Sequence, residues 1–535
     1  MALPRIRTIT IDKWDGGIAS NGLWTPNPEF IKGKEGQLGY VVGMDPYRFP
    51  GVICPGPAMT DSLTNISSVT TNVRKFLRRT LVESGAENRK IYALGGSQIN
   101  EIDPDVVSTT APFPKTVDHG HANEMISDAI MYQLNSAWRM FYTFNDETDS
   151  DMGMFDFSTF DDDYLSTVPT NAALLGTVAG GSGMHPHSLA VGDNNILYIA
   201  NGSVLDQLDG RAATAVYTAA KIDTRLGNII KDHLAYKGFH WIGTKIINAT
   251  TGLDFSNVHV FSRTGSAAVY IWNYISSNFE DVIPLTGDSD ILKMEIYNGI
   301  PYILTKTYEG FVRLRKWNGR EFEQVVDLAT DTKNEFPWGG TFRYHNLLCW
   351  ISASSGEVIC HGRPSPEQPV ATNSIWKVSD NAISAIIEVA ENAPNSGTYY
   401  VADNEASLRI KKLSISSAGG FGAGAAQVRS LVYDLPWGSR LHWIKLYFPT
   451  FTYTGATRTM IVAVSLNRSS SYTTAEAVDF DTVEGAGYRY IPFNQNNVSS
   501  FQLRLTYSGN IAAAQPCIMP AKIEIGYSIP RDKRR

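Results

Sequence analysis

The chain has 535 residues, too many for one ordinary hydrophobic core, because single cores stop growing near about 250 to 300 residues. It therefore requires either several domains or a repeated, radial architecture. Its net charge of -7 argues against a protein that coats nucleic acid, since such binding depends on neutralising phosphates.

Turn formers and aromatic residues are abundant, with 45 Gly, 25 Tyr and 11 Trp, and this composition favours an all-β fold. The first residues, MALPRIRTITIDKW, contain no apolar stretch of signal-peptide length. No run elsewhere approaches the roughly 18 to 20 apolar residues of a spanning helix. We therefore expect synthesis in the cytosol and no insertion into a membrane.

Residues 1–65 are predicted to form an extended N-terminal arm and the strands that lead into the next domain. The stretch 43–61, GMDPYRFPGVICPGPAMTD, is dense in Pro and Gly and unsuited to any long element. We expect it to run extended across the following domain or into a neighbouring molecule.

Residues 66–416 contain seven copies of one phrase, in which a polar turn precedes a dense apolar strand, the hairpin signal. The copies are spaced by about 43 to 61 residues. They are ENRKIYA from Glu87, NSAWRMF from Asn135, DNNILYI from Asp193, YKGFHWI from Tyr236, YNGIPYI from Tyr297, HNLLCWI from His345 and NSGTYYV from Asn395.

A third strand follows most copies, as in QINEID from Gln98 and RLRKWN from Arg313. A repeat of this length with three or four short strands is typical of propeller blades, because one small sheet cannot bury both faces alone. The sequence therefore predicts a seven-bladed β-propeller. Two copies align closely, pairing Trp272 with Trp317 and Phe279 with Phe322, and we interpret these aromatics as core between blades rather than ligand platforms.

A small-residue linker, SAGGFGAGAAQ at 417–427, marks the clearest domain boundary. Residues 428–535 alternate strongly between apolar and polar, which predicts six to eight strands and a C-terminal β-sandwich of the jelly-roll kind, ending in a basic tail at 531–535. Exposed aromatics in its loops, such as Tyr453 or Tyr472, could stack on sugar.

The four cysteines, Cys54, Cys349, Cys360 and Cys517, show no C-x-x-C spacing, so neither a zinc site nor a redox pair is indicated. Cys349 and Cys360 could face each other across a hairpin, and we interpret them as reduced, buried thiols.

Two pairs of histidines are candidate metal ligands. His119 and His121, with Glu124, could present two imidazoles on one side of a strand, but the sequence identifies no third ligand. His185 and His187 are better explained by the start of the first strand of the third repeat. We assign no metal, cofactor or catalytic residue.

An acidic stretch contains enough carboxylates for calcium, but only Asp149, Asp151 and Gly153 follow a calcium-loop spacing, so a solvated loop between blades is expected. Its acidic residues are Asp146, Glu147, Asp149, Asp151, Asp156, Asp161, Asp162 and Asp163. The basic run of Arg74, Lys75, Arg78 and Arg79 is interrupted by apolar residues and fits a strand with exposed cations.

Several segments together resemble structural proteins of tailed-phage virions. The resemblance covers nearly the whole chain and concerns the kind of segments present and their order. The segments are IDKWDGGI at 11–18, GMDPYRFPGVICPGPAMTD at 43–61, GDNNILYIANGSVLDQLDG at 192–210, LVYDLPWGSRLHWIKLYFPTF at 431–451 and FQLRLTYSG at 501–509.

This resemblance implies a propeller-bearing tail component of the nozzle or hub kind, made in the host cytoplasm and located in the virion tail. It implies contacts with copies of itself in a symmetric ring and with neighbouring tail proteins, with DNA at most as passing cargo. The N-terminal arm and the basic tail are candidates for contacts between subunits.

Three functions are therefore considered. The first is a non-enzymatic structural protein of a virion tail. The second is a carbohydrate- or receptor-binding tail protein that uses the C-terminal sandwich to contact a host surface glycan or receptor. The third is a propeller glycosidase, which needs two suitably spaced acids that sequence spacing cannot reveal.

Overall fold

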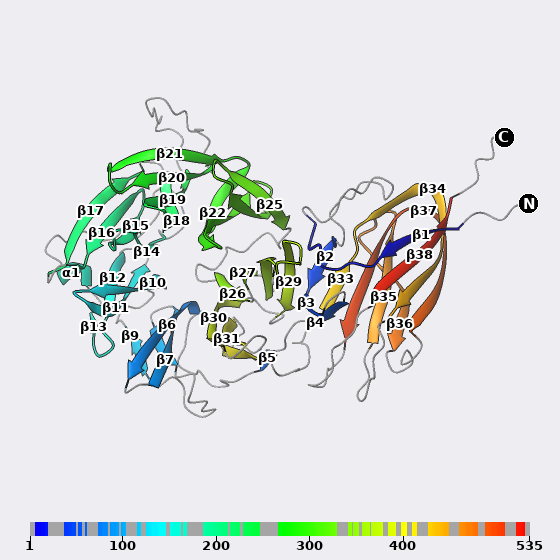
Figure 1. Ribbon diagram of the computed structural model, residues 1–535, viewed down its shortest axis with the longest axis horizontal. Coiled ribbons are helices and arrows are strands. Elements are labelled where there is room, and N and C mark those ends of the chain that lie inside the picture. Colours follow the sequence, from blue (N-terminus) through cyan, green and yellow to red (C-terminus); the bar gives the residue numbers. More distant parts are fainter. Residues whose placement is uncertain are drawn as a thin grey trace, which may run out of the picture.

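Short antiparallel strands joined by tight turns make up most of the chain in the computed structural model (Figure 1). The structure describes residues 6–19, 37–49, 52–55, 59–60, 73–83, 86–95, 98–102, 115–118, 125–145, 150–161, 164–167, 186–211, 214–224, 228–246, 266–328, 341–344, 346–352, 356–363, 365–377, 383–391, 397–403, 409–414, 426–448, 459–479, 487–508 and 520–529. The all-β prediction is confirmed. The single described helix, α1 (Tyr164–Thr167), has one turn, and no described helix has the length and apolar character needed to span a membrane.

The described residues contain a β-propeller (Figure 1). Seven four-stranded antiparallel sheets are found among them. The first four sheets are β6 (Val73–Glu83), β7 (Ala86–Gly95), β8 (Gln98–Ile102) and β9 (Lys115–Asp118); β10 (Met125–Leu134), β11 (Ala137–Asn145), β12 (Ser150–Phe155) and β13 (Phe160–Asp161); β14 (Leu189–Val191), β15 (Leu197–Asn201), β16 (Val204–Asp209) and β17 (Val216–Asp223); and β18 (Asn228–Tyr236), β19 (Phe239–Ile246), β20 (Ala267–Asn273) and β21 (Asn278–Leu285).

Three further four-stranded sheets follow along the chain. They are β22 (Asp288–Tyr297), β23 (Ile300–Thr307), β24 (Val312–Trp317) and β25 (Phe322–Leu328); β26 (Thr341–Tyr344), β27 (Leu347–Ser352), β28 (Glu357–Gly362) and β29 (Ala371–Lys377); and β30 (Ile383–Glu391), β31 (Gly397–Asp403) and β32 (Arg409–Ser414) with β5 (Met59–Thr60). The last sheet thus takes its fourth strand from a segment that precedes the propeller.

Each repeated phrase supplies the second strand of one four-stranded sheet, and the predicted third strands occupy the third position. The turn before the second strand explains the phrase. Lys237 and Gly238 both have positive φ, at 50° and 81°, and Asn298 and Gly299 have φ of 49° and 72°. Two-residue turns of this kind match the twist of the flanking strands and favour Asn and Gly.

The first strands of the sheets contact one another around the propeller axis, in the order β30, β6, β10, β14, β18 and β22, with β26 also against β30. Hydrophobic clusters lie between neighbouring sheets, so each sheet buries both faces only through its neighbours. The first strands of the sheets are therefore the ones nearest the axis (Figure 1).

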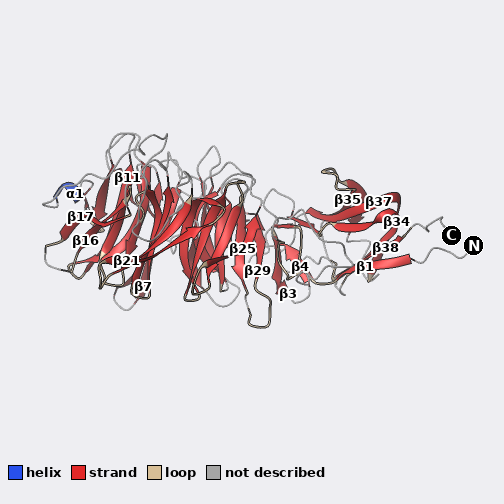
Figure 2. Ribbon diagram, turned by 90° about the horizontal axis from the view of Figure 1, so that it is seen from above, coloured by secondary structure: helices blue, strands red, loops and turns tan. Residues whose placement is uncertain are grey.

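The C-terminal region forms one curled eight-stranded sheet. Its main order is β1 (Ile6–Ile11), β38 (Lys522–Ser528), β34 (Tyr433–Tyr447), β37 (Tyr488–Ser508), β33 (Ala426–Arg429) and β2 (Tyr40–Val42), and a branch adds β35 (Thr459–Leu466) beside β37 and β36 (Thr473–Asp479) beside β35. The propeller and this sheet lie end to end in both views (Figure 1, Figure 2).

The predicted sandwich of two separate sheets is not what the described residues form. The reason is β37, a strand of 21 residues. Its first half pairs with β34, and its second half pairs with β33 on one side and β35 on the other. The two layers of a sandwich thus become one sheet that curls around a single apolar cluster.

The predicted N-terminal arm is integrated into both parts of the molecule. β1 and β2 belong to the C-terminal sheet, a hairpin of β3 (Met44–Phe49) and β4 (Val52–Pro55) follows, and β5 completes a propeller sheet. The stretch 43–61 thus contains three strands of the same chain where an extended run across the propeller or into a neighbour was expected. The linker at 417–427 lies mostly outside the described residues, and its last two residues begin β33.

The junction between the two parts is made by residues near Gly17. The amide of Ile18 donates to the carbonyl of Thr372 on β29 at 2.7 Å, and the Tyr40 hydroxyl donates to Glu357 on β28 at 2.9 Å. The Ile18 side chain packs against both the C-terminal cluster and a propeller cluster. Gly17 has φ of +80°, and a Cβ there would lie 2.8 Å from Ala371, so only glycine fits this close approach.

Candidate functional site

The metal candidates from the sequence do not form a site in the described part of the chain. Residues 119–124 and His185 lie outside it. His187 is fully buried before β14, and its ring nitrogen Nδ1 lies 2.7 Å from the Ala200 carbonyl, which confirms a structural position at the start of a strand. Among the described residues, no group of three or more His, Cys, Asp or Glu side chains is placed to hold a metal ion.

The described part of the acidic stretch, residues 150–161, forms β12, β13 and the turn between them where a solvated loop was expected. Asp156 organises that turn: its Oδ1 accepts hydrogen bonds from the hydroxyl and amide of Ser158 at 2.7 and 2.8 Å and from the amide of Thr159 at 2.7 Å. These bonds lower the pKa of Asp156. The remaining acids, Asp146, Glu147, Asp149, Asp162 and Asp163, lie outside the described residues.

The basic run lies on β6, as predicted, but its cations are not all exposed. Lys75 forms an ion pair with Asp128 on the neighbouring β10, and the guanidinium of Arg79 lies 3.3 Å from the ring centroid of Phe157. Arg78 is exposed. Two of the four cations therefore join adjacent propeller sheets.

A β-bulge recurs near the start of the first strand in five propeller sheets. The pairing register shifts between Val73 and Lys75, Ile126 and Asp128, Ile230 and Asp232, Ile291 and Lys293, and Ile383 and Ala385. A bulge turns the following side chain to a new direction. In four of the five sheets, the residue after the bulge is charged.

These four residues, Lys75, Asp128, Asp232 and Lys293, form an inner belt near the propeller axis. Asp128 accepts a hydrogen bond from the Leu189 amide on β14 at 2.8 Å, and Asp232 accepts one from the Met294 amide on β22 at 2.7 Å. Each carboxylate also pairs with a lysine, and Asp232 lies 2.9 Å from the Lys293 ammonium. The inner belt therefore uses its charges to hold neighbouring sheets together.

A buried chain of polar side chains runs outward from the inner belt. The Ser188 carbonyl lies 2.8 Å from Nε2 of His233, whose Nδ1 lies 2.7 Å from Nε2 of His240. The Tyr274 hydroxyl lies 2.6 Å from Nδ1 of His240. Because a carbonyl only accepts, His233 donates to Ser188, His240 donates to His233, and Tyr274 donates to His240, with both imidazoles neutral. Burial lowers the pKa of both histidines.

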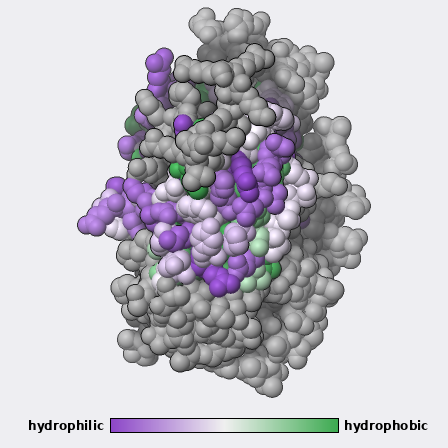
Figure 3. Space-filling model, turned by 90° about the vertical axis from the view of Figure 1, so that its right-hand side faces the viewer, coloured by the Kyte–Doolittle hydropathy of each residue, from purple (hydrophilic) through white to green (hydrophobic). Residues whose placement is uncertain are grey.

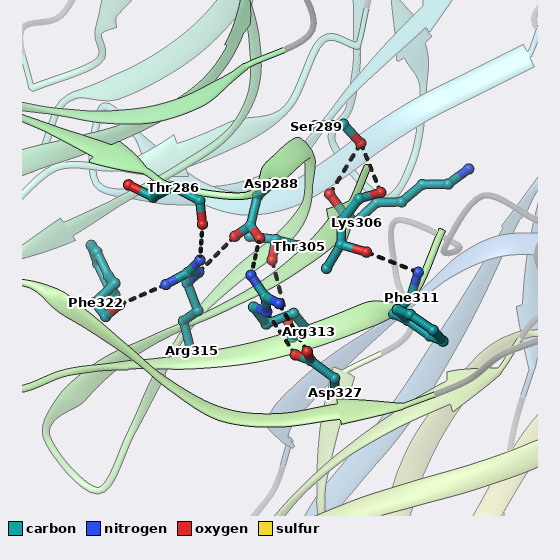
Figure 4. Close-up of polar contacts among 11 residues, drawn as sticks. Thr286, Asp288, Ser289, Thr305, Lys306, Phe311, Arg313, Arg315, Phe322 and Asp327 are labelled. Atoms are coloured by element: carbon teal, nitrogen blue, oxygen red, sulfur yellow. Dashed lines mark hydrogen bonds and ion pairs between the residues drawn. The ribbon is translucent and has the colours of Figure 1, made fainter. Parts of the chain in front are cut away.

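A second buried polar cluster lies within the β22–β25 sheet (Figure 4). Asp288 is fully buried and accepts from Arg313 at 2.9 Å and from Arg315 at 2.6 Å. Arg313 also binds Asp327 through two nitrogens, at 2.6 and 2.8 Å. Arg315 completes its contacts with the carbonyls of Phe322 and Thr286. The cluster is satisfied internally, which is how buried charges are tolerated.

The repeated aromatics are core, as predicted. Trp317 and Phe322 pack edge-on against Trp241 of the preceding sheet, with ring centroids 5.0 and 5.8 Å apart. Trp272 and Phe279 occupy the equivalent cluster one sheet earlier. The cysteine prediction also holds: Cys349 and Cys360 are directly opposed on β27 and β28, and both are buried free thiols.

The two loop residues that were predicted to stack on sugar are Tyr453 and Tyr472. Tyr453 lies outside the described residues. Tyr472 is half-buried, and the guanidinium groups of Arg504 and Arg429 lie 4.2 and 5.6 Å from its ring centroid. Its hydroxyl donates to Gln502. Tyr472 is therefore already engaged within the chain.

A different set of aromatics is exposed on the outer face of the C-terminal sheet. We call Trp443, Tyr447, Tyr488, Tyr490 and Lys445 the aromatic face. Tyr447 is directly opposite Tyr488, and Lys445 is directly opposite Tyr490, so all four point to the same side. Tyr488 is 50 % exposed and Tyr490 is 49 % exposed. Ring centroids lie 6.1 Å apart for Trp443 and Tyr490, and 6.3 Å apart for Tyr447 and Tyr488.

Polar groups border the aromatic face on β38. Lys522 pairs with Glu524 at 2.5 Å, and Glu524 accepts a hydrogen bond from the Tyr447 hydroxyl at 2.7 Å. Gly526 leaves room for the indole of Trp443, since a Cβ there would lie 2.3 Å from it. Figure 3 shows this end of the molecule, where the described surface is mostly hydrophilic to neutral with small hydrophobic spots.

The sequence-based prediction did not identify the aromatic face, because its residues lie within predicted sandwich strands and only loop aromatics were considered as binding residues. Its signal is nevertheless present in RLHWIKLYF, where Trp443, Lys445 and Tyr447 alternate with the buried Ile444 and Leu446. Alternate residues of a strand point to opposite faces. The same alternation in YRYIPF places two tyrosines on the outer side.

No protein-family model and no curated protein sequence matches this chain. The propeller alone does not decide a function, because the same scaffold supports unrelated activities. The arguments for function therefore rest on how the described residues are used.

Proposed function

We propose that this protein is a non-enzymatic structural component of a phage virion, a tail part of the nozzle or hub kind that acts through protein–protein interfaces. The sequence resemblance described above supports this role. One structural observation supports it further, namely the way in which the N-terminal segment connects the propeller to the C-terminal sheet.

That segment contributes β1 and β2 to the C-terminal sheet and β5 to the propeller. Between them, Ile18 is hydrogen-bonded to Thr372, and Tyr40 is hydrogen-bonded to Glu357. Relative motion of the two parts would break paired backbone and buried side-chain contacts together. A body fixed in this way suits a component that must keep neighbouring subunits at a set distance.

The charged groups near the axis support the same interpretation. Lys75, Asp128, Asp232 and Lys293 bind neighbouring propeller sheets, and Arg313 and Arg315 bind carboxylates inside one sheet. We infer that each of the seven four-stranded sheets is one blade, with β5 closing the ring. The partners proposed are copies of this chain in a symmetric ring and adjacent tail proteins, with DNA at most as passing cargo.

Mass spectrometry of purified virions from cells that express the chain tests this proposal. Peptides of the chain should be found in intact particles at a stoichiometry of several copies per virion. Native mass spectrometry of the purified protein should show a closed oligomer or its assembly with a tail partner. Absence of the chain from the particles would overturn the proposal.

A further inference from the structure

We propose that the aromatic face binds a carbohydrate chain. This inference does not depend on the proposed role in a virion, because it concerns one surface of the C-terminal sheet. It rests on the arrangement of rings, hydrogen-bonding groups and charge on β34, β37 and β38.

The four rings form two neighbouring pairs on one side of the sheet, with angles between the ring planes of 35° for Trp443 and Tyr490 and 41° for Tyr447 and Tyr488. Around Lys445 to Tyr447, the pairing of β34 with β37 and with β38 runs without a register shift, so the side chains stand in regular rows. Adjacent strands are about 4.8 Å apart, and alternate residues on one strand are about 6.8 Å apart. Four rings therefore cover an area comparable to a few linked sugar units. Pyranose rings present apolar C–H faces, which stack on aromatic rings of this kind.

Hydrogen-bonding groups of both kinds border the rings. Lys445 supplies an ammonium donor, and the hydroxyls of Tyr488 and Tyr490 can donate and accept. Lys522, Glu524 and the Tyr447 hydroxyl are joined to one another at the border. The Lys445 ammonium lies over the rings of Tyr447 and Tyr488, 4.8 and 4.4 Å from their centroids. Sugar hydroxyls need such a mixture of donors and acceptors next to an apolar surface. Sheet faces of small β-domains bind oligosaccharides in this way.

The charge on this surface favours a sugar over a nucleic acid. Stacked bases also bind aromatic rings on sheets, but their phosphates require a clearly positive surface. Here Lys522 is already paired with Glu524 at 2.5 Å, so Lys445, Lys522 and Glu524 together carry a net charge of only +1. The whole chain has a net charge of -7. The near-neutral face therefore complements a neutral or weakly acidic glycan.

The same surface is a poor match for a protein hot spot. Such sites place an aromatic or aliphatic anchor into a desolvated pocket. The outward positions of the three strands instead hold rings, charged side chains, Pro492 and Gly526 in adjacent rows on one side of the sheet. A protein partner remains an outcome that the experiment separates.

The test uses the full-length protein on an array of defined oligosaccharides and soluble bacterial polysaccharides, followed by titration calorimetry with the best binder. The double variant Tyr488→Ala/Tyr490→Ala removes two exposed rings and should lower the affinity at least tenfold. Trp437→Ala is the matched control, because Trp437 is 81 % exposed on the same strand β34 but outside the aromatic face. It should bind as the wild-type protein does.

Binding of no glycan by the wild-type protein would overturn the inference, as would unchanged affinity in the double variant. Stronger binding of a single-stranded oligonucleotide or of a tail protein that is lost in the double variant would also overturn it. Oligomeric state and presence in virions are measured on the same variants. Loss of glycan binding with assembly retained separates this inference from the proposed structural role.

Discussion

At the scale of single residues, the charged and polar side chains inside the propeller mainly hold sheets to one another. Asp232 shows this most directly, because its carboxylate binds both the Met294 amide and the Lys293 ammonium of the adjacent sheet. Burial alone would lower the pKa of Lys293, but the carboxylates of Asp232 and Asp128 raise it instead, so the ammonium form is held in place. Removing the Asp232 carboxylate is therefore costly, because the Met294 amide and the Lys293 ammonium would lose their acceptor.

Asp232→Ala should therefore reduce the free energy of unfolding by about 3 kcal/mol, because it leaves a mostly buried ammonium and a buried amide without their acceptor. Asp281→Ala is the control, since Asp281 is exposed on β21 and should change stability by less than about 0.5 kcal/mol. Urea unfolding followed by tryptophan fluorescence measures both. Equal effects in the two variants would contradict this account of the inner belt.

The buried histidines His233 and His240 predict a pH dependence of stability. Their pKa values are lowered by burial, whereas in the unfolded chain they return to about 6.5. Below that pH the unfolded state binds protons that the folded state does not. The free energy of unfolding should therefore fall as pH drops below about 6.5, by at most about 1.4 kcal/mol per pH unit for each histidine.

Urea unfolding between pH 7.5 and 5 measures this decline. NMR of the folded protein provides a check that needs no variant, because the ring signals of His233 and His240 should stay in their neutral positions through pH 6. If either ring titrates near 6.5 in the folded protein, the proposed orientation of the polar chain is wrong.

At the scale of elements, the sequence neighbours of a strand do not decide which sheet it joins. β1 lies at the start of the chain but pairs with β38 near its end, in register from Ile11 opposite Ile523 to Ile6 opposite Ser528. β5 precedes the propeller yet pairs with β32 of its last sheet. These long-range pairings cover edges that would otherwise be open to another chain.

Ile11→Ala tests whether β1 is an integral strand of the C-terminal sheet. Ile11 is 7 % exposed and belongs to the core of that sheet, so its truncation should cost about 2 to 5 kcal/mol. Ile6→Ala is the control on the same strand, since Ile6 is 49 % exposed and should have almost no effect. Thermal unfolding followed by circular dichroism compares the two. A neutral Ile11→Ala would mean that β1 is not held by the core.

At the scale of the whole molecule, the propeller and the C-terminal sheet contact each other through the N-terminal segment. The contact at Gly17 is central, because its backbone approaches Ala371 and Thr372 of β29 more closely than any Cβ allows. If this contact couples the two parts, they should unfold in a single thermal transition. The proposed structural role requires that the propeller and the C-terminal sheet unfold together in this way.

Gly17→Ala should split the calorimetric unfolding of the protein into two transitions, because the new Cβ would lie 2.8 Å from Ala371 and force the junction apart. Gly319→Ala is the matched control. Gly319 also has a positive φ, of +102°, but a Cβ there meets nothing within 4 Å. It should cost only about 1 kcal/mol through backbone strain and leave one transition. A single transition in Gly17→Ala would contradict the coupling.

Much of the propeller could be predicted from the sequence, because its signals are local. The phrase before β23 contains the turn Asn298–Gly299 and the apolar strand that follows it, and both act within a few residues of chain. The core role of Trp317 and Phe322 followed from the same repetition. The aromatic face was less accessible, because Tyr447 and Tyr488 are adjacent only through the pairing of β34 with β37.

By itself, the sequence determined the all-β class, the positions of strands within each four-stranded sheet and the burial of the repeated aromatics, since these depend on turn chemistry and on alternation along one strand. The tertiary structure alone decided that the C-terminal strands form one curled sheet, that the N-terminal segment connects both parts, and that Trp443, Tyr447, Tyr488 and Tyr490 share one face. The physical reason is that pairing between distant strands depends on which edges remain to be covered, and no local pattern encodes that choice.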